Sequence, residues 1–134
     1  MKKHIKLVVF FLSLLIVFGT YKIFSKNMSK LKYIALGDSI AEGMNSYGVI
    51  DYGYSDYISD YLNKNNRLDF YTKKFSKSGY TTRDVINDIE NNKSVTINNK
   101  KVYLKEILRE SNLVTLTIGA NNFIKSFSLR SHGM

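Results

Sequence analysis

The stretch Leu31–Gly43, LKYIALGDSIAEG, joins a short apolar strand over Tyr33–Leu36 to a tight turn at Gly37-Asp38-Ser39. A helix is predicted to begin near Ile40. A serine at such a strand-to-helix turn exposes its hydroxyl, and its backbone N–H faces the positive end of the helix beyond it. This geometry suits a nucleophile and the anion that its attack generates. The alternative is an ordinary turn, because glycine, aspartate and serine are all common turn residues.

Composition limits the classes of protein that the chain can represent. Its 134 residues are enough for one domain. The absence of cysteine excludes disulfides, cysteine-based metal sites and a thiol nucleophile. The formal net charge is +9, but residues 1–32 hold seven lysines and no acid. The remaining 102 residues carry 13 basic and 11 acidic side chains, a net charge of +2, so the body does not resemble a nucleic-acid-binding protein.

The N-terminal segment resembles a secretory leader that is not cleaved. A basic start, Met1–Lys6, precedes the apolar run LVVFFLSLLIVFG at Leu7–Gly19. No small-x-small cleavage site comes after it, which favours an uncleaved anchor. Residues Ile5–Phe24 would reach the roughly 20 residues of a membrane span. The alternative is a buried helix of a globular core.

This segment sets the predicted domain organisation and location. Residues 1–24 are predicted to form a signal anchor or transmembrane helix, residues 25–32 a basic linker, and residues 33–134 the body. Lysines flank both ends of the apolar run, so the positive-inside rule does not fix its orientation. Because leader-like segments direct the rest of the chain to export, we expect a single-pass protein of the cell membrane with its body outside the cytoplasm. Cleavage of the leader would make it a secreted protein.

In the body, strands are predicted to alternate with helices. Gly53–Asn65 is an amphipathic helix, and its tyrosine stripe (Tyr54, Tyr57, Tyr61) is expected to pack in the core, with a substrate-lining wall as the alternative. The other expected elements are a strand at Leu68–Phe75, a turn at Ser76–Tyr80, a helix over Arg83–Glu90 capped by Thr81 or Thr82 with Val85, Ile86 and Ile89 buried, a hairpin of Val95–Ile97 and Lys100–Tyr103, a helix over Tyr103–Glu110, a buried strand at Leu113–Ile118, and a helix over Phe123–Leu129.

The alternation of strands and helices indicates an α/β fold with a parallel sheet. In such sheets ligands bind beyond the carboxyl ends of the strands. Ser39, Gly79 and Asn121 each come after a predicted strand. We therefore expect three separate turns to converge on one crevice.

Three sequence blocks together resemble the SGNH/GDSL family of esterases and lipases. The first is Gly37-Asp38-Ser39-Ile40 followed by Ala41-Glu42-Gly43, the second is the glycine of Ser78-Gly79-Tyr80, and the third is Gly119-Ala120-Asn121-Asn122. Their order, spacing and strand context agree with the family from about Tyr33 to Phe123. The resemblance implies a flavodoxin-like three-layer α/β fold with a parallel sheet. It departs from the family at Asn122, where the family pattern has aspartate.

The resemblance also implies roles for individual residues. Ser39 would be the nucleophile that attacks an ester carbonyl. The backbone N–H groups of Ser39 and Gly79 and the side-chain amide of Asn121 would form the oxyanion hole. The implied substrate is a small-molecule, lipid or carbohydrate ester, and neither a cofactor nor a metal is implied. The sequence does not indicate which ester, or an oligomeric state.

The family's catalytic base is missing from its expected place. The family supplies it from an Asp-x-x-His block well downstream of the third block. Here His132 is too close to that block and has Leu129 where the aspartate would stand, and His4 lies in the leader. We therefore assign no base and expect a C-terminally truncated member, with an incomplete sheet and impaired activity. The alternative function is a non-catalytic remnant whose oxyanion cleft binds an anion or acyl group.

Overall fold

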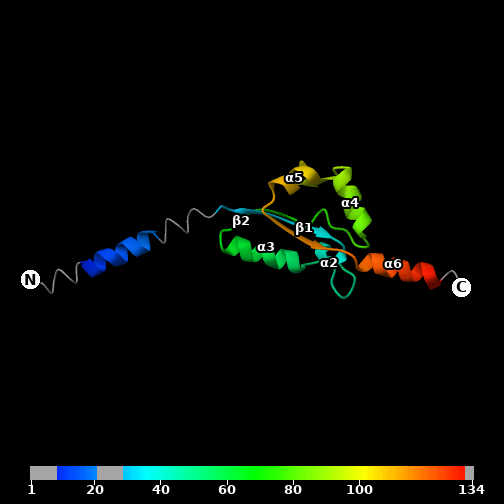
Figure 1. Cartoon of the computed structure of the whole chain (residues 1–134), viewed down its shortest axis with the longest axis horizontal. Coiled ribbons are helices and arrows are strands. Elements are labelled where there is room, and N and C mark those ends of the chain that lie inside the picture. Colours follow the sequence, from blue (N-terminus) through cyan, green and yellow to red (C-terminus); the bar gives the residue numbers. More distant parts are fainter. Residues whose placement is uncertain (1–8, 21–28, 132–134) are drawn as a thin grey trace, which may run out of the picture.

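The computed structural model describes residues 9–20 and 29–131, and Figure 1 shows the arrangement of its elements. Three parallel strands form the central sheet in the order β2-β1-β5. Strand β1 (Leu31–Gly37) lies in the middle, between β2 (Leu68–Thr72) and β5 (Leu113–Thr117). Residues 33–37 of β1 are all buried, because a central strand of a parallel sheet is covered on both faces. The α/β class and the parallel sheet are thus confirmed, and the sheet fits the SGNH fold.

The helices cover both faces of this sheet. Figure 1 shows α3 (Tyr54–Lys64) on one side, and α4 (Thr82–Glu90) and α5 (Leu104–Glu110) on the other. One buried cluster joins Tyr33 and Ala35 of β1 to α3, and a second joins Ile34 and Leu36 to α5. The period-2 alternation of β1 therefore divides the core into two layers.

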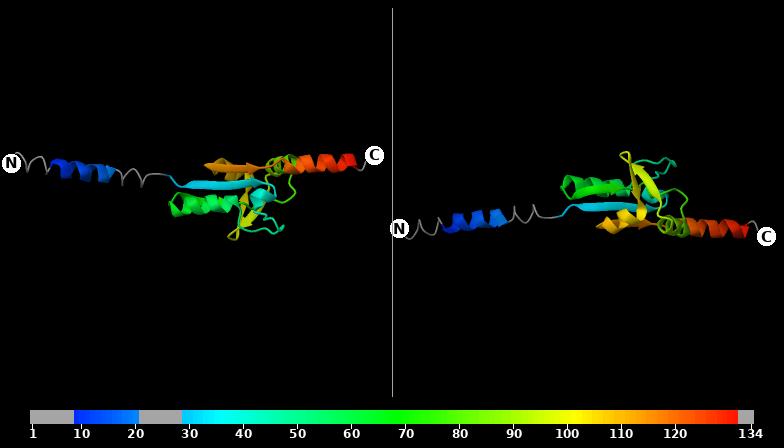
Figure 2. Two further views of the ribbon diagram at one scale, coloured as in Figure 1. Left: turned by 90° about the horizontal axis from the view of Figure 1, so that it is seen from below. Right: turned by 90° about the horizontal axis from the view of Figure 1, so that it is seen from above.

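The remaining elements are short or peripheral. Helix α2 is a single turn after β1, and α6 continues beyond the carboxyl end of β5 (Figure 2). The predicted hairpin is confirmed, and Asn98 and Asn99 turn it with φ of 47° and 61°, as a two-residue hairpin loop requires. The bounds of these elements are Ser39–Glu42 for α2, Ser94–Ile97 for β3, Lys100–Tyr103 for β4 and Ala120–Ser131 for α6.

Two tyrosines of the α3 stripe do not pack in the core as predicted. Tyr57 and Tyr61 are 67% and 68% exposed, whereas Ser55, Ser59 and Leu62 are buried. Tyr54 is half-buried, and its hydroxyl shares a hydrogen bond with the Thr115 hydroxyl at 3.0 Å. The reason lies on the sheet, where the rings of Tyr33 and Tyr71 stack with centroids 5.1 Å apart and fill the space under the helix. Small serines let the helix approach these rings, and the hydroxyls of Tyr71 and Ser55 share a hydrogen bond at 2.8 Å.

Other predicted boundaries and burials also differ. Ile86 is exposed, although Val85 is buried on α4 and Thr81 caps that helix as expected. Strand β2 ends at Thr72, three residues before its predicted end. The prediction of a buried strand at β5 is wrong for Val114 and Leu116, which are exposed.

The predicted membrane-spanning anchor over residues 5–24 is wrong. Within the described residues, we find no helix with the length and apolarity needed to span a membrane. Residues 9–20 of the expected span are helical. Residues 5–8 and 21–24 of the expected span lie outside the described residues. The prediction of a single-pass protein of the cell membrane is corrected accordingly.

A close backbone contact joins the ends of β1 and β5. Gly37 has φ of +135°, and a Cβ added there would lie 1.8 Å from the carbonyl oxygen of Thr117. The next residue, Asp38, donates its N–H to the same carbonyl at 3.0 Å. Only glycine permits this approach, because any side chain would collide with the β5 backbone.

We expect Gly37→Ala to lower the free energy of unfolding by about 2–4 kcal/mol, from backbone strain and the clash with Thr117. The measurement is urea denaturation followed by circular dichroism. Gly48→Ala is the matched control, because Gly48 also has positive φ (+77°) but open space around its Cβ position. This control should cost only about 1 kcal/mol. Equal losses in the two variants would contradict the close contact.

A polar cluster holds the start of α3 against β2. The Asp56 carboxylate accepts hydrogen bonds from the Gly53 N–H at 2.7 Å, the Lys73 ammonium at 2.6 Å and the Tyr71 hydroxyl at 3.0 Å. Burial alone would raise the pKa of Asp56, but Lys73, Gly53 and Tyr71 outweigh it and hold that pKa below its usual 3.8. The ionised carboxylate is therefore the form that stabilises the fold.

Because the pKa of Asp56 is lower in the folded chain, its stabilisation is complete above about pH 4 and is lost as the pH falls through the folded value. We expect Asp56→Asn to lower the urea midpoint of unfolding at pH 7. The difference in urea midpoint between the variant and the wild type should become smaller at pH 3. Asp69→Asn, at an exposed carboxylate, is the control and should show no such narrowing. A gap that stays constant between pH 7 and pH 3 would refute the assignment.

Candidate active site

Ser39 is the first residue of α2, directly after the end of β1. Asp38 caps this helix, and its buried carboxylate accepts a hydrogen bond from the Ile40 N–H at 3.1 Å. The N–H of the first helical residue has no acceptor within a helix, so the Ser39 N–H stays available. Gly43 ends the helix after one turn in the left-handed conformation. Ser39 is half-buried, and we see no hydrogen bond from its hydroxyl to another described residue.

The Ser76–Tyr80 turn is tied to β1 and α2. The Ser76 hydroxyl donates to the Ala35 carbonyl at 2.9 Å, and the Lys77 N–H donates to the Gly37 carbonyl at 3.0 Å. Ser78 gives both its N–H and its hydroxyl to one oxygen of the Glu42 carboxylate, at 2.6 and 2.5 Å. These contacts fix the second block against the first.

Gly79 lies in this turn with φ of +82°, and no heavy atom stands within 4 Å of its Cβ position. The residue is exposed, and no described group accepts a hydrogen bond from its N–H. A glycine here therefore leaves an accessible donor without a shielding side chain.

Asn121 and Asn122 lie in the first turn of α6. The Asn121 amide nitrogen donates to the Tyr80 carbonyl at 2.8 Å, one residue from Gly79. The Asn122 amide oxygen accepts from the Thr82 N–H and hydroxyl at 3.0 and 3.2 Å. The third block is thus bound to the second block through Asn121 and to the start of α4 through Asn122. The sequence predicted a turn here, but the helix begins already at Ala120.

An ion pair lies behind the second block. The Lys93 ammonium contacts the Asp88 carboxylate at 2.7 Å and the Tyr80 hydroxyl at 2.6 Å. Burial and the Asp88 carboxylate raise the pKa of Tyr80, although Lys93 opposes the shift. The Tyr80 hydroxyl is therefore protonated at neutral pH. Lys93 is itself paired with Asp88, so this cluster supports the turn.

The structure brings the three predicted blocks together at the carboxyl ends of the strands. The first block contacts the second through Glu42 and Gly37, and the second block contacts the third through Tyr80. Strand β5, which precedes the third block, contacts the first block through Thr117.

Two residues that hold the blocks together were not predicted to do so. Glu42 and Asn122 both belong to the blocks, but neither had a role in the sequence-based prediction. Their partners, Ser78 and Thr82, are far away in the sequence, so no local sequence pattern predicts these contacts. The two histidines, His4 and His132, lie outside the described residues.

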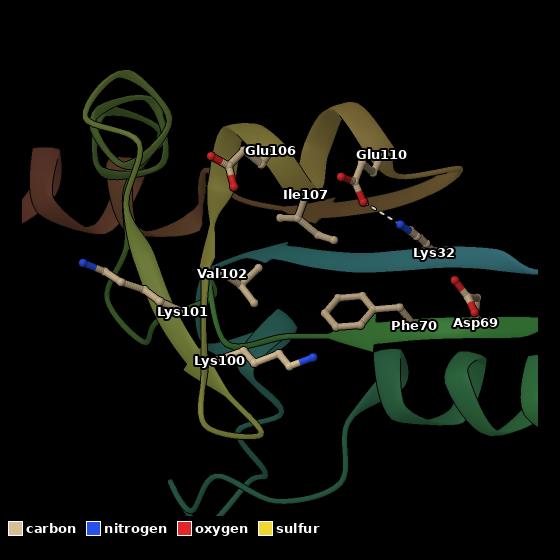
Figure 3. Close-up of a pocket in the computed structure, with 9 residues that line it drawn as sticks. All are labelled: Lys32, Asp69, Phe70, Lys100, Lys101, Val102, Glu106, Ile107 and Glu110. Carbon is tan, nitrogen blue, oxygen red and sulfur yellow. Dashed lines mark hydrogen bonds and ion pairs between the residues drawn. The ribbon is translucent and has the colours of Figure 1, made fainter.

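A pocket of about 490 Å³ lies elsewhere, at the opposite end of the sheet (Figure 3). Lys32 and Asp69, at the starts of β1 and β2, line it together with residues of α5 and the hairpin. The Lys32 ammonium pairs with the Glu110 carboxylate at 2.5 Å across its rim. None of the three blocks reaches this pocket. In the described part of the chain, no group of three or more histidine, aspartate or glutamate side chains is arranged to hold a metal ion.

Comparison with protein families identifies the class of protein. Residues 33–132 match the family model described as GDSL-like lipase/acylhydrolase. The match spans most of the chain, and the chain belongs to this family, which confirms the resemblance predicted from the three blocks. Searches of the curated proteins and of the solved structures give no match.

We expect Glu42→Ala to release the Ser78–Gly79 turn from α2. Removing the carboxylate leaves two donors of Ser78 without their acceptor, which should cost about 1–3 kcal/mol of stability. Amide hydrogen exchange should report a Ser78 N–H that exchanges at least about tenfold faster. Glu42→Gln keeps one acceptor oxygen and should show a smaller effect.

Glu106→Ala, at an exposed carboxylate of α5, is the control for loss of charge and should leave exchange at Ser78 unchanged. An unchanged Ser78 exchange rate in Glu42→Ala would mean that the turn is held by its backbone contacts alone.

Proposed function

We propose that the chain carries the acyl-transfer site of a GDSL-type serine ester hydrolase, with Ser39 as the nucleophile. The observation that supports this most is the set of hydrogen bonds joining the three family blocks at one end of the sheet. Attack of the Ser39 oxygen on an ester carbonyl forms the new C–O bond and places a negative charge on the carbonyl oxygen. Release of the alcohol then leaves an acyl-serine that water hydrolyses.

The oxyanion hole in this proposal consists of the Ser39 N–H, the Gly79 N–H and the Asn121 amide. An amide nitrogen carries two hydrogens. One points to the Tyr80 carbonyl and fixes the side chain, and the other is left for the oxyanion. Each preorganised donor of this kind contributes about 3–4 kcal/mol to a tetrahedral intermediate. Glu42 and Asn122 contribute indirectly, because they hold the turns that carry two of the donors.

The proposed site lacks an identified base for the Ser39 hydroxyl proton. A serine hydroxyl needs a base that accepts its proton during attack, and such a base contributes about 10²–10⁴-fold to the rate. Within the described residues, no side chain accepts a hydrogen bond from Ser39. We therefore propose that this chain hydrolyses esters slowly, even with the proposed oxyanion donors.

The surroundings favour a substrate with an apolar acyl group. Ile40, next to Ser39, is 56% exposed, and Tyr47 and Val49 are exposed on the loop after α2. Small-molecule esters fit the family, and lipid and carbohydrate esters remain within the proposal. The second candidate function is a non-catalytic pocket for an anion or acyl group, which is favoured because no described side chain accepts a hydrogen bond from the Ser39 hydroxyl.

Chemical rescue should separate the two functions. We expect the chain to hydrolyse p-nitrophenyl butyrate scarcely faster than Ser39→Ala in buffer alone. Added imidazole can accept the proton, so the wild-type rate should then exceed that of Ser39→Ala by about tenfold or more. Subtracting the Ser39→Ala rate removes the hydrolysis that imidazole catalyses by itself. Release of nitrophenol is the measurement.

Ser46→Ala, at an exposed loop serine, is the matched control and should behave as the wild type. A high Ser39-dependent rate without imidazole would show that the chain supplies its own base. No Ser39-dependent rate under either condition would overturn the hydrolase and leave the binding function.

A further inference from the structure

The pocket of about 490 Å³ in Figure 3 is separate from the candidate active site. It lies where β1 and β2 begin, whereas Ser39 comes after the end of β1. Strand β1 has 7 residues, so at about 3.3 Å per residue the two sites are about 20 Å apart along the sheet. Sites for small molecules have volumes of about 300–1,000 Å³. The pocket is therefore large enough for a ligand of its own.

The floor of the pocket is apolar. Phe70 of β2, Val102 of β4 and Ile107 of α5 line it, and Figure 3 shows the Phe70 ring at its centre. Ile107 is buried in the core, and Phe70 and Val102 are half-buried against the same cluster. The core therefore holds the ring in place and leaves part of it accessible from the pocket.

A shift in strand register places a carboxylate beside this ring. Leu31 of β1 pairs with Leu68 of β2. The next β1 residue, Lys32, pairs with Phe70, so the register skips Asp69. In a regular strand Asp69 and Phe70 would point to opposite faces of the sheet, whereas here both line the pocket. Irregularities of this kind are common near functional sites, because they redirect a side chain.

The rim of the pocket carries acidic and basic side chains in equal number. The bases are Lys32, Lys100 and Lys101, and the acids are Asp69, Glu106 and Glu110. Lys32 pairs with Glu110, and the Lys101 ammonium lies over the Tyr103 ring, 5.2 Å from its centroid. Among the described residues, neither the Lys100 ammonium nor the Glu106 carboxylate has a hydrogen-bond or ion-pair partner. These two groups are available to a ligand.

The combination of an apolar floor and a balanced rim restricts the class of ligand. Because the charges of the rim cancel, they give no strong attraction for an anion or a cation. A wholly apolar ligand would remove water from the charged groups and return no hydrogen bond. A neutral ring with hydroxyls at its edge and C–H groups on its faces suits both parts. Its hydroxyls donate to carboxylates and accept from ammonium groups, and such charge-assisted bonds are the stronger ones.

We propose that this pocket binds a pyranose unit of a neutral carbohydrate. The sugar ring packs on the Phe70 ring, Glu106 accepts hydrogen bonds from its hydroxyls, and Lys100 donates to them. Equatorial hydroxyls are required, because an axial hydroxyl would meet the Phe70 ring. A carbohydrate bound here leaves the crevice at Ser39 open, so the pocket attaches the chain to the carbohydrate and takes no part in the chemistry. The proposal does not depend on the function of Ser39.

Titration of the full chain with cellotriose, followed by proton–nitrogen correlation spectra, tests the proposal. The glucose units of cellotriose carry equatorial hydroxyls and present C–H groups on both faces. The amide signals of Phe70, Val102 and Ile107 should shift and saturate. The dissociation constant should be about 0.1–10 mM, because the sugar hydroxyls give up their bonds to water. The Ser78 and Gly79 amides should not shift. Absence of a saturable shift at the pocket would overturn the proposal, wherever else the sugar binds.

Substitutions at the rim should weaken this binding selectively. Lys100→Ala and Glu106→Ala each remove a charge-assisted hydrogen bond and should raise the dissociation constant at least about fivefold. The matched controls are Lys64→Ala and Glu90→Ala, at exposed residues outside the pocket, and they should bind as the wild type does. Equal dissociation constants in the rim variants and the controls would refute the site.

A substitution in the floor tests the role of the ring. Phe70→Leu keeps an apolar side chain but removes the flat surface, and should also weaken binding at least about fivefold. Urea denaturation of this variant verifies that it is folded before the titration. Undiminished affinity in the folded variant would contradict the stacking on Phe70.

An ionic ligand would behave differently from a neutral sugar. Cellotriose affinity should fall less than about threefold between about 0.02 and 0.2 M sodium chloride, because salt screens only the attraction between charges. L-Phenylalanine, a zwitterion with an apolar side chain, should bind more weakly than cellotriose at the same amides. A larger loss of affinity in salt, or tighter binding of L-phenylalanine, would mean that the pocket recognises charge and would overturn the carbohydrate.

Discussion

The contact between Gly37 and the Thr117 carbonyl is the constraint on which the candidate site depends. At this point β1 and β5 end side by side, and the absence of a side chain lets their backbones approach. The Asp38 N–H bonds to the Thr117 carbonyl, and the Gly37 carbonyl accepts the Lys77 N–H. The serine turn, the second block and the last strand therefore meet at one residue. A glycine in the first block is needed for packing as much as for the turn.

The sequence was most informative where structure depends on local interactions. The Thr81 cap of α4 and the Asn98-Asn99 turn of the hairpin result from residue types and spacing, and both are present. The alternation of strands and helices predicted a parallel sheet, and the three blocks predicted the family. Their gathering at one end of the sheet is then a consequence of parallel topology, because strand carboxyl ends share an edge.

Prediction failed where burial depends on a distant partner. Tyr57 and Tyr61 have helical spacing that suits a core, but the stacked rings of Tyr33 and Tyr71 already fill the sheet face beneath α3. The apolar content of β5 suggested a buried strand, but the burial of its side chains depends on which elements cover each face of the sheet, and that is not a local property. The apolar run at the N-terminus suggested a membrane span, but no helix among the described residues is long and apolar enough to form one.

The roles of Ser39, Gly79 and Asn121 remain predictions, but the geometry separates two requirements of ester hydrolysis. Preorganised donors need turns that are held still, and Glu42, Asn121 and Asn122 hold them through contacts between blocks. Activation of the hydroxyl needs a base within hydrogen-bond reach, which is an independent requirement. Because preorganised donors do not imply a base, a chain of this family can have the oxyanion donors without rapid turnover.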